Sequence, residues 1–415
     1  MKTGLADRTA MCDPGMGGFS YGSSMVGTPG GLVRIARIAI GGLLIAGLAI
    51  VHAVGAPAAR SMFTVHAIKH VWVIELENEG YPQSFGDPAA DPYLARTLPQ
   101  LGALLKNYYA IGHDSADNYI AQVSGQAPNP LTQQDCPVWV PLPDAAAGPY
   151  RQLLAPGGGC VFPATVPTLG NQLTAVKLGW KAYLEDMGND PARDDTIATP
   201  AGPACGHPGI WGVDLTGDAT RTDQYAVRHE GFMFFRSVTG NEGYCAAHIV
   251  SFEPLPADLK EAAAQAPAFS WITPNLCDDG HDIPCVTGQR GGFTQIDGFL
   301  SHWVPLIMAS PAYKAGGLIL ITFDEGATDS ACCGETAGRG SAHPNTAEPG
   351  LSGPGGGDVG MVALSPYIKP GTVSMAYYNH YSMLRTIEDI FGLPHLGDAA
   401  EPGVRSFGKD VFTIA

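Results

Sequence analysis

HVWVIELEN, at residues 70–78, and GLILITFDE, at residues 317–325, are the two stretches that decide the fold. Each is a mostly apolar run that changes abruptly to acidic or amide side chains. This pattern is typical of a strand buried on both faces, as in a parallel sheet covered by helices. Active sites of such sheets lie beyond the carboxyl ends of the strands. We therefore expect the polar residues that follow the two runs to meet at one edge of the sheet: Glu77, Asn78, Asp324 and Glu325.

Similar apolar runs alternate with helical patterns along the rest of the chain. This alternation predicts an α/β fold with a mostly parallel central sheet covered by helices. Further strands are expected at Trp180–Leu184, His248–Phe252, Phe269–Thr273 and Val359–Leu364. Helices are expected at about Tyr93–Leu105, Asn118–Ser124, Ala257–Ala264, Phe299–Ala309 and Tyr381–Phe391.

The composition limits the kinds of partner. With 45% hydrophobic and 15% charged residues over 415 positions, the chain can bury a large core and does not have the composition of a disordered protein. The 23 basic and 39 acidic residues give a formal net charge of −16. Bulk charge therefore repels nucleic acid and anionic membrane surfaces at long range. An anionic substrate has to be held by a metal or a local pocket.

The N-terminal part has the pattern of an export signal. Arg34 and Arg37 precede the apolar run Ile38–Val51, and Ala56-x-Ala58 follows as a small-x-small cleavage site. The alternative is an uncleaved anchor, for which about 14 apolar residues are short beside the roughly 20 that span a bilayer. We therefore expect a secreted or cell-envelope protein with an N-terminal extension and export signal at 1–58 and a folded domain at 59–415.

Eight cysteines follow the signal, and an even number in an exported chain suggests disulfides. Eight cysteines can form four bonds in 105 different ways, and proximity in sequence favours one of them. A zinc cluster is the alternative, but no C-x2-C spacing supports it. The segment from about 128 to 217, rich in Pro and Gly, is expected to be a disulfide-pinned insertion. The favoured pairs are Cys136–Cys160, Cys205–Cys245, Cys277–Cys285 and Cys332–Cys333.

A possible nucleophile stands in the segment GHDSADNYIAQVSGQ, at residues 112–126. Ser115 comes at the start of an expected short helix, where unpaired N–H groups and the helix dipole favour a phosphoryl anion and an ionised alkoxide. Asn118, one turn later, can donate to a phosphate oxygen. The alternative is that Ser115 is only a helix cap and Asn118 a surface polar residue.

Several motifs together resemble the bacterial phosphoesterase family of acid phosphatases and phospholipases C. They occur in order over about residues 68–394, which makes the match more specific than any one of them. The motifs are Glu77-Asn78, Ser115-x-x-Asn118-Tyr119-Ile120, Ser124-Gly125-Gln126, Tyr225–His229, Ile272–Asp282, Thr322–Gly326 and Asn379–Glu388.

The resemblance implies a fold and a set of site residues. The family is similar to the alkaline phosphatase superfamily, which implies a three-layer α/β/α sandwich and a metal-assisted hydroxyl nucleophile within 59–415. Ser115 matches the nucleophile and Asn118 a phosphate-contacting asparagine. Four further residues match the remaining metal-binding or phosphate-contacting positions: His229 and His281 are assigned to catalysis, and Asp279 and His380 to the metal. The main metal-binding positions match Glu77, Asn78, Asp324 and Glu325.

The residue types fit this chemistry, although they do not identify the metal. Carboxylates suit hard ions such as Ca²⁺ and Mg²⁺, whereas imidazoles favour zinc or iron. Two departures from the family pattern concern substrate preference: Asp117 stands where proline is common, and Glu230-Gly231 replaces the usual Asn-Pro. His113 lies beside Ser115 without an assigned role.

The sequence thus predicts an exported, metal-dependent phosphoric ester hydrolase with a serine nucleophile. A phosphomonoesterase of the acid phosphatase kind is the first expectation, because the chain ends at residue 415 without the C-terminal domains of longer phospholipases C. Phospholipase C or another phosphodiesterase is the alternative, and a catalytically silent ligand-binding module is a third. The expected partner is a phosphorylated small-molecule or lipid substrate, and no stable protein partner is inferred.

Overall fold

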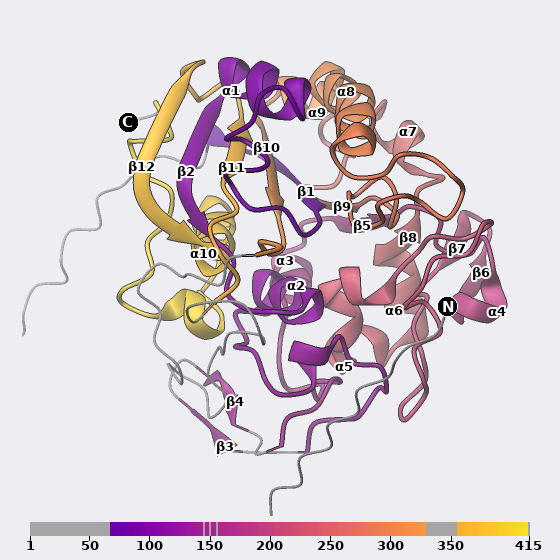
Figure 1. The fold of residues 1–415 in the computed structure, drawn as a ribbon. Helices are drawn as coiled ribbons and strands as arrows, with labels where there is room; N and C mark the ends of the chain where they lie inside the picture. The colour runs from indigo at the N-terminus through magenta and orange to yellow at the C-terminus, as the bar shows by residue number, and fades with distance from the viewer. Residues whose placement is uncertain (1–66, 144–145, 149–150, 155–156, 329–354, 414–415) are drawn as a thin grey trace, which may run out of the picture. The chain divides into compact units, whose positions relative to one another are not determined.

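The computed structural model describes residues 67–143, 146–148, 151–154, 157–328 and 355–413 (Figure 1). These residues belong to the contact unit Ser61–Ala415. The expected export signal and the Cys332–Cys333 pair lie outside them. Among the described residues, no helix is both long and apolar enough to cross a membrane.

A ten-stranded sheet forms the centre of this unit. β1 (His70–Leu76) lies between β10 (Gly317–Phe323) and β9 (Phe269–Thr273) and runs parallel to both. Leu76 is paired with Phe323, so β1 and β10 end at the same level. The strand order is β12-β2-β11-β10-β1-β9-β5-β8-β7-β6.

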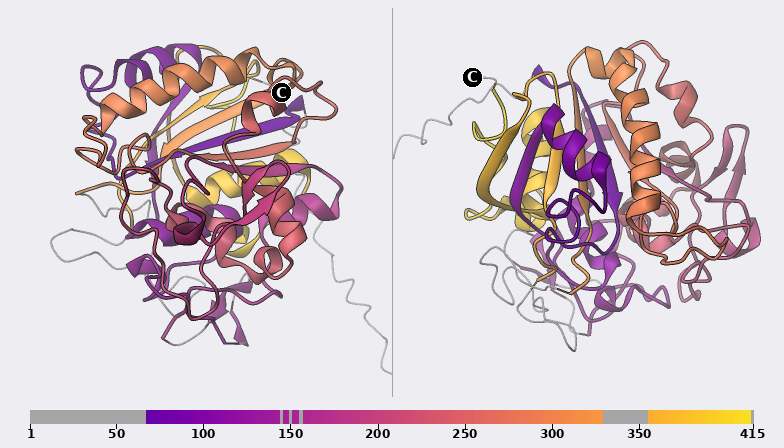
Figure 2. Two further views of the ribbon diagram at one scale, coloured as in Figure 1. Left: turned by 90° about the vertical axis from the view of Figure 1, so that its right-hand side faces the viewer. Right: turned by 45° about the horizontal axis from the view of Figure 1, so that its top comes forward.

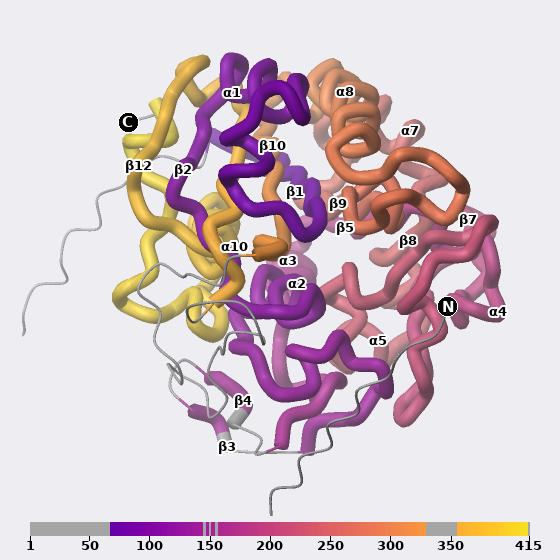
Figure 3. The backbone as a smooth tube through the Cα atoms, viewed as in Figure 1, coloured from indigo at the N-terminus to yellow at the C-terminus, as the bar shows by residue number. Residues whose placement is uncertain are grey.

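The outer strands complete a mixed, mostly parallel sheet. β11 is antiparallel to β10 and β2, and β7 is antiparallel to β8 and β6. The chain brings β2 and β12 side by side although they are far apart in sequence (Figure 3). The bounds are β2 Ala103–Tyr109, β5 Trp180–Leu184, β6 Ile197–Thr199, β7 Gly202–Ala204, β8 Ile249–Ser251, β11 Met361–Leu364 and β12 Thr372–Asn379, with a separate pair β3 Ala146–Ala147 and β4 Leu153–Leu154.

Helices cover both faces of the sheet. The long helix α8 lies along one side, and α10 and α2 lie on the other (Figure 2). This confirms the predicted three-layer α/β/α sandwich. The helices are α1 Leu98–Leu101, α2 Ser115–Ser124, α3 Leu169–Ala175, α4 Pro191–Asp194, α5 Arg236–Thr239, α6 Glu242–His248, α7 Leu255–Asp258, α8 Phe293–Ala309, α9 Pro311–Lys314 and α10 His380–Phe391; shorter 3-10 or π turns occur at Tyr93–Thr97, Thr132–Gln134, Val227–His229, Gly231–Phe234 and Gly397–Ala400.

Two of the expected helices are wrong in part. The helix expected over Tyr93–Leu105 ends at Leu101, because Gly102 has non-helical backbone angles (φ −146°, ψ −139°) and β2 begins at Ala103. A Cβ at Gly102 would lie 2.1 Å from the backbone oxygen of Ala363, so the close pairing of β2 and β11 requires glycine there. The helix expected over Ala257–Ala264 is limited to the single turn α7.

Three of the expected disulfides are confirmed. Cys136–Cys160, Cys205–Cys245 and Cys277–Cys285 are bonded, with Cα–Cα distances of 5.7, 5.5 and 5.2 Å. The first lies within the segment 128–217, and the second ties the end of that segment to α6. The same segment also contains β5, which is a strand of the central sheet.

Candidate active site

The polar residues that follow β1 and β10 meet at the carboxyl edge of the sheet. The Asn78 backbone N–H donates to Asp324 Oδ1 at 3.1 Å, and the Asn78 side-chain amide donates to Glu77 Oε2 at 3.1 Å. Glu325 forms an ion pair with His113 Nδ1. The expectation that these strand ends converge is therefore met for Glu77, Asn78 and Asp324, while Glu325 is directed to the loop that precedes α2.

Ser115 joins this group from the start of α2. Its hydroxyl is 2% exposed and donates to Glu77 Oε2 at 3.0 Å. The helix begins after the extended residue Asp114 and ends at Gly125, which has a left-handed conformation that favours glycine. Every residue of α2 is buried, so packing fixes the position of Ser115 relative to the strand ends.

Asn118 holds the loop before Ser115. Its Oδ1 accepts from the backbone N–H groups of Ile111 and Gly112, at 2.9 and 3.1 Å, and its Nδ2 donates to the carbonyls of Gly112 and Asp114. Both polar atoms of the Asn118 amide are thus hydrogen-bonded to backbone groups within residues 111–114. These bonds connect Asn118 to the loop that precedes Ser115, and the expected contact with phosphate stays a prediction.

A buried cluster of Glu77, His229 and Asp279 adjoins the serine, with possible ligand atoms within 4.8 Å of one another. His229 Nδ1 lies 3.1 Å from Asp279 Oδ2. His229 Nε2 lies 3.4 Å from Glu77 Oε1 and has no hydrogen bond to any residue that the structure describes. Burial lowers the pKa of His229 well below its usual value, and the nearby Arg228 acts in the same direction. The imidazole is therefore neutral, with its proton on Nδ1 toward the carboxylate and an electron pair on Nε2.

The carboxylates at this edge are in an unfavourable environment. Burial raises the pKa of Glu77 well above its usual value, and repulsion from Asp324 and Asp279 raises it further. Burial also raises the pKa values of Asp279 and Asp324. Among the described residues, Asp324 Oδ2 has no hydrogen-bond partner. A cation would remove this repulsion and satisfy the unpaired atoms, so the donor set fits a divalent metal ion.

The remaining two histidines have other contacts. His281 Nδ1 pairs with Asp282 at 2.9 Å, and its Nε2 lies 3.1 Å from the Arg228 guanidinium. His380 Nε2 donates to the Asp324 backbone oxygen at 2.7 Å, and its Nδ1 faces the Tyr108 hydroxyl at 3.0 Å. Because both ring nitrogens of His380 are occupied, we leave it out of the ligand set and assign it the positioning of Asp324.

Sequence reasoning missed two residues of the site. The Tyr119 hydroxyl donates to Glu77 Oε1 at 2.6 Å, and its ring stacks on His229 with centroids 5.4 Å apart. The buried Arg228 guanidinium lies 3.4 Å from Asp135, whose other oxygen accepts from the Ala116 N–H beside Ser115. Both residues stand inside the recognised motifs, but the motifs give no information on where their side chains point.

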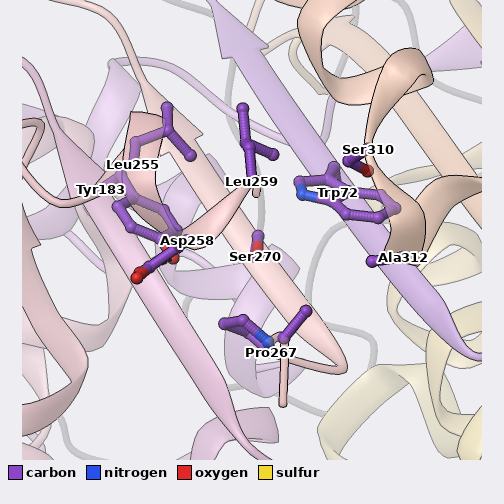
Figure 4. A pocket seen from close by; sticks show the side chains of 10 residues that line it. Trp72, Tyr183, Leu255, Asp258, Leu259, Pro267, Ser270, Ser310 and Ala312 are labelled. Atoms are coloured by element: carbon purple, nitrogen blue, oxygen red, sulfur yellow. Dashed lines mark hydrogen bonds between the residues drawn. The ribbon is translucent and has the colours of Figure 1, made fainter. Parts of the chain in front are cut away.

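Two cavities and one cysteine cluster lie outside the group of residues around Ser115. A small cavity of about 10 Å³ is lined by Trp72 of β1, Tyr183 of β5, Leu255 of α7 and Ala312 of α9, among others (Figure 4). It has room for about one water molecule. A larger cavity of about 670 Å³ borders Ser124, at the end of α2 opposite Ser115. Cys205 and Cys245, which lie beside His207, are disulfide-bonded and offer no thiolates.

At the carboxyl edge of the sheet, the α/β sandwich places a buried hydroxyl beside carboxylates and a neutral imidazole. This arrangement is typical of hydrolases. Residues 87–394, more than half of the chain, match the Phosphoesterase family. The chain belongs to this family, as the motifs of the sequence indicated.

Two curated relatives and one solved structure are similar to this chain. A probable acid phosphatase of Kluyveromyces lactis is 27% identical over 80% of this chain, which spans 60% of that protein. A phosphatidylinositol-3-phosphatase of Mycobacterium tuberculosis is 24% identical over 80% of this chain and 79% of its own length. A protein in the alkaline phosphatase superfamily from Vibrio parahaemolyticus has a TM-score of 0.44 at 13% identity, over 83% of this chain and 72% of that one.

Proposed function

We propose that this protein is an exported phosphoric ester hydrolase, and first a phosphomonoesterase, that uses Ser115 as its nucleophile and depends on a divalent metal. The observation that carries the proposal is the buried hydrogen bond from Ser115 Oγ to Glu77 Oε2, beside a cluster suited to a cation. Acid phosphatases among the relatives favour the monoester. The three disulfides fit an oxidising compartment and hence export.

The metal would be held by Glu77, Asn78 and Asp324, with His229 as a further ligand. The motifs also imply Glu325, which in this structure pairs with His113. A ligating histidine usually donates its other ring N–H to a carboxylate, which is the arrangement of His229 and Asp279. When bound, a divalent ion would stabilise the charge on the phosphoryl oxygens and make the serine hydroxyl more acidic.

The residues of the chain account for the rest of the reaction. The bond from Ser115 Oγ to phosphorus forms as the bond from phosphorus to the ester oxygen breaks. The serine proton passes to Glu77 Oε2, which already accepts it, and from there to the leaving oxygen, which departs as an alcohol. Negative charge on the phosphoryl group faces the N-terminus of α2 and lies near the Arg228 guanidinium. Water then releases phosphate from the serine. His380 and Asn118 keep the strand end and the loop in place.

Replacement of the serine tests this proposal. Ser115→Ala should lower kcat for p-nitrophenyl phosphate by at least about a thousand-fold, because it removes the nucleophile. The control is Ser124→Ala, at the other end of the same helix, which should keep its activity. Circular dichroism and the unfolding midpoint should be unchanged for Ser115→Ala. Retention of more than about a tenth of the wild-type kcat would exclude Ser115 as the nucleophile.

Metal content and substrate choice are measured on the same samples. Chelation should abolish turnover and a divalent ion should restore it, and Glu77→Gln and Asp324→Asn should lower metal content together with kcat. Full activity in protein shown by elemental analysis to be metal-free would refute the metal dependence. Comparison of a monoester, a diester and phosphatidylcholine separates the phosphomonoesterase from the phospholipase C alternative.

A further inference from the structure

Five exposed apolar side chains gather on two adjacent segments of the chain. Val138 and Val213 form an antiparallel bridge, and the Trp211 N–H donates to the Trp139 carbonyl at 2.9 Å, so the segments around 138 and 213 lie side by side. Trp211, Leu215 and Val213 are 64%, 61% and 59% exposed. Exposed apolar side chains grouped on neighbouring segments mark an interaction site more often than single exposed residues do. We call it the Trp211 patch: Val138, Ile210, Trp211, Val213 and Leu215.

The backbone beneath the patch is held firmly. Cys136 is disulfide-bonded two residues before Val138, and Cys205 is disulfide-bonded before the second segment. The buried Trp139 ring stacks on His207 and Phe234, with centroids 5.3 and 5.1 Å apart. The apolar side chains are therefore presented by a braced surface, which reduces the conformational entropy lost on binding.

The patch is continuous with the candidate active site. Arg228 Nη1 donates to the Gly217 carbonyl at 2.8 Å, two residues after Leu215. On the other segment, Asp135 accepts from the Ala116 N–H at 2.8 Å and stands three residues before Val138. Three extended residues span at most about 10 Å. A surface that covers the patch would therefore lie close to Ser115.

The charge of the protein and the side chains of the Trp211 patch indicate what kind of surface would bind there. Asp214 is the acidic residue between the exposed side chains, and its carboxylate turns back to accept from the N–H and hydroxyl of Thr216, at 2.7 Å each. The chain as a whole carries a net charge of −16, which disfavours anionic surfaces. An exposed tryptophan among aliphatic side chains suits the boundary between lipid headgroups and acyl chains.

We infer that the Trp211 patch docks the protein on an electrically neutral lipid–water interface and so brings a phosphoester at that interface to Ser115. The use of this contact in catalysis rests on the proposed function, whereas the docking itself needs no turnover.

Vesicle binding tests the inference. Wild-type protein and the inactive Ser115→Ala variant should both co-sediment with phosphatidylcholine vesicles. The double variant Trp211→Ala/Leu215→Ser should bind at least about ten-fold more weakly, because two exposed apolar anchors are lost. A matched control replaces two similarly exposed residues of the edge strand β12, Val373→Ser/Met375→Ser, and should bind as the wild type does. Both double variants should keep turnover of p-nitrophenyl phosphate within about two-fold, since neither touches the site.

Four results would overturn the docking surface: no binding of the wild type to these vesicles, binding only to anionic vesicles, equal loss in the β12 control, or a dimer in sedimentation velocity that dissociates in the Trp211→Ala/Leu215→Ser variant. The last of these would assign the patch to a second copy of the chain. Vesicle binding that depends on Trp211 in a protein without any phosphatase activity would support the docking surface and refute the proposed function.

Discussion

Tyr119 contacts two members of the candidate cluster at once, through its hydroxyl on Glu77 and its ring on His229. Tyr119→Phe keeps the ring and removes the hydroxyl. A hydrogen bond to a charged group contributes about 1.5–3 kcal/mol, so kcat and metal affinity should fall by roughly ten-fold or more, with little change in KM. Steady-state kinetics and metal titration measure both effects.

The control for this variant is Tyr313→Phe, on α9, which should leave kcat and metal affinity unchanged. Wild-type metal affinity and kcat in Tyr119→Phe would show that the hydroxyl does not position Glu77.

Strand ends were predictable at the residue scale, but the directions of the side chains were not. Glu77, Asn78 and Asp324 could be expected to converge because continuous apolar runs placed them at the ends of buried strands. His380 could not be recognised as a positioning residue, since its partners Tyr108 and Asp324 come from distant parts of the chain. Asn118 was expected to face the substrate, whereas its amide bonds to backbone groups within seven residues of it.

At the scale of elements, the prediction was best where burial alone decides the structure. β1, β5, β9 and β10 have the expected bounds because their apolar runs suit a strand buried on both faces. β2 and β12 were missed. β2 includes the polar pair Lys106-Asn107, and the edge strand β12 exposes Val373, Met375 and Tyr377 in alternation. These two segments are strands because they pair with each other, and β2 also with β11. No local sequence pattern encodes such distant pairing.

Helix α10 carries a buried acid that should make stability depend on pH. Burial raises the pKa of Glu388 well above the ordinary glutamate value of about 4.5, and its Oε1 accepts from the Leu396 N–H at 2.8 Å. The unfolded chain releases this proton at lower pH than the native state does. The native state therefore loses stability as the pH rises from about 4.5 toward the native pKa, by up to about 1.4 kcal/mol per pH unit.

Glu388→Gln keeps the acceptor for Leu396 and removes the titration. Relative to the wild type, the variant should gain stability as the pH is raised from about 5 to 7 in urea unfolding experiments. The exposed Glu253→Gln is the control and should follow the wild type. A constant difference in unfolding free energy between wild type and Glu388→Gln across this range would contradict a raised native pKa.

For the whole molecule, two of the disulfides differ in what they hold: Cys205–Cys245 braces the fold, and Cys277–Cys285 braces the candidate site. Cys205–Cys245 closes a separation of 40 residues between the end of β7 and α6, and β7 is separated from β1 in the sheet by β9, β5 and β8. Cys277–Cys285 closes a separation of 8 residues, and the loop between its cysteines carries Asp279 and His281. Sequence proximity was enough to predict both pairs, but their different places in the molecule emerge only from the fold.

Removing each of these two disulfides in turn should therefore affect the stability of the fold and the activity of the enzyme to different extents. Chain entropy assigns about 4 kcal/mol to the 40-residue loop and about 2.5 kcal/mol to the 8-residue loop, and all four cysteines are buried, so Cys→Ala replacements are comparable. Cys205→Ala/Cys245→Ala should lose more unfolding free energy in urea, yet keep most of its kcat while folded. Cys277→Ala/Cys285→Ala should lose less stability but more kcat, because the loop that holds Asp279 against His229 is freed. Equal losses of kcat in the two folded variants would show that this loop keeps its position without the bridge.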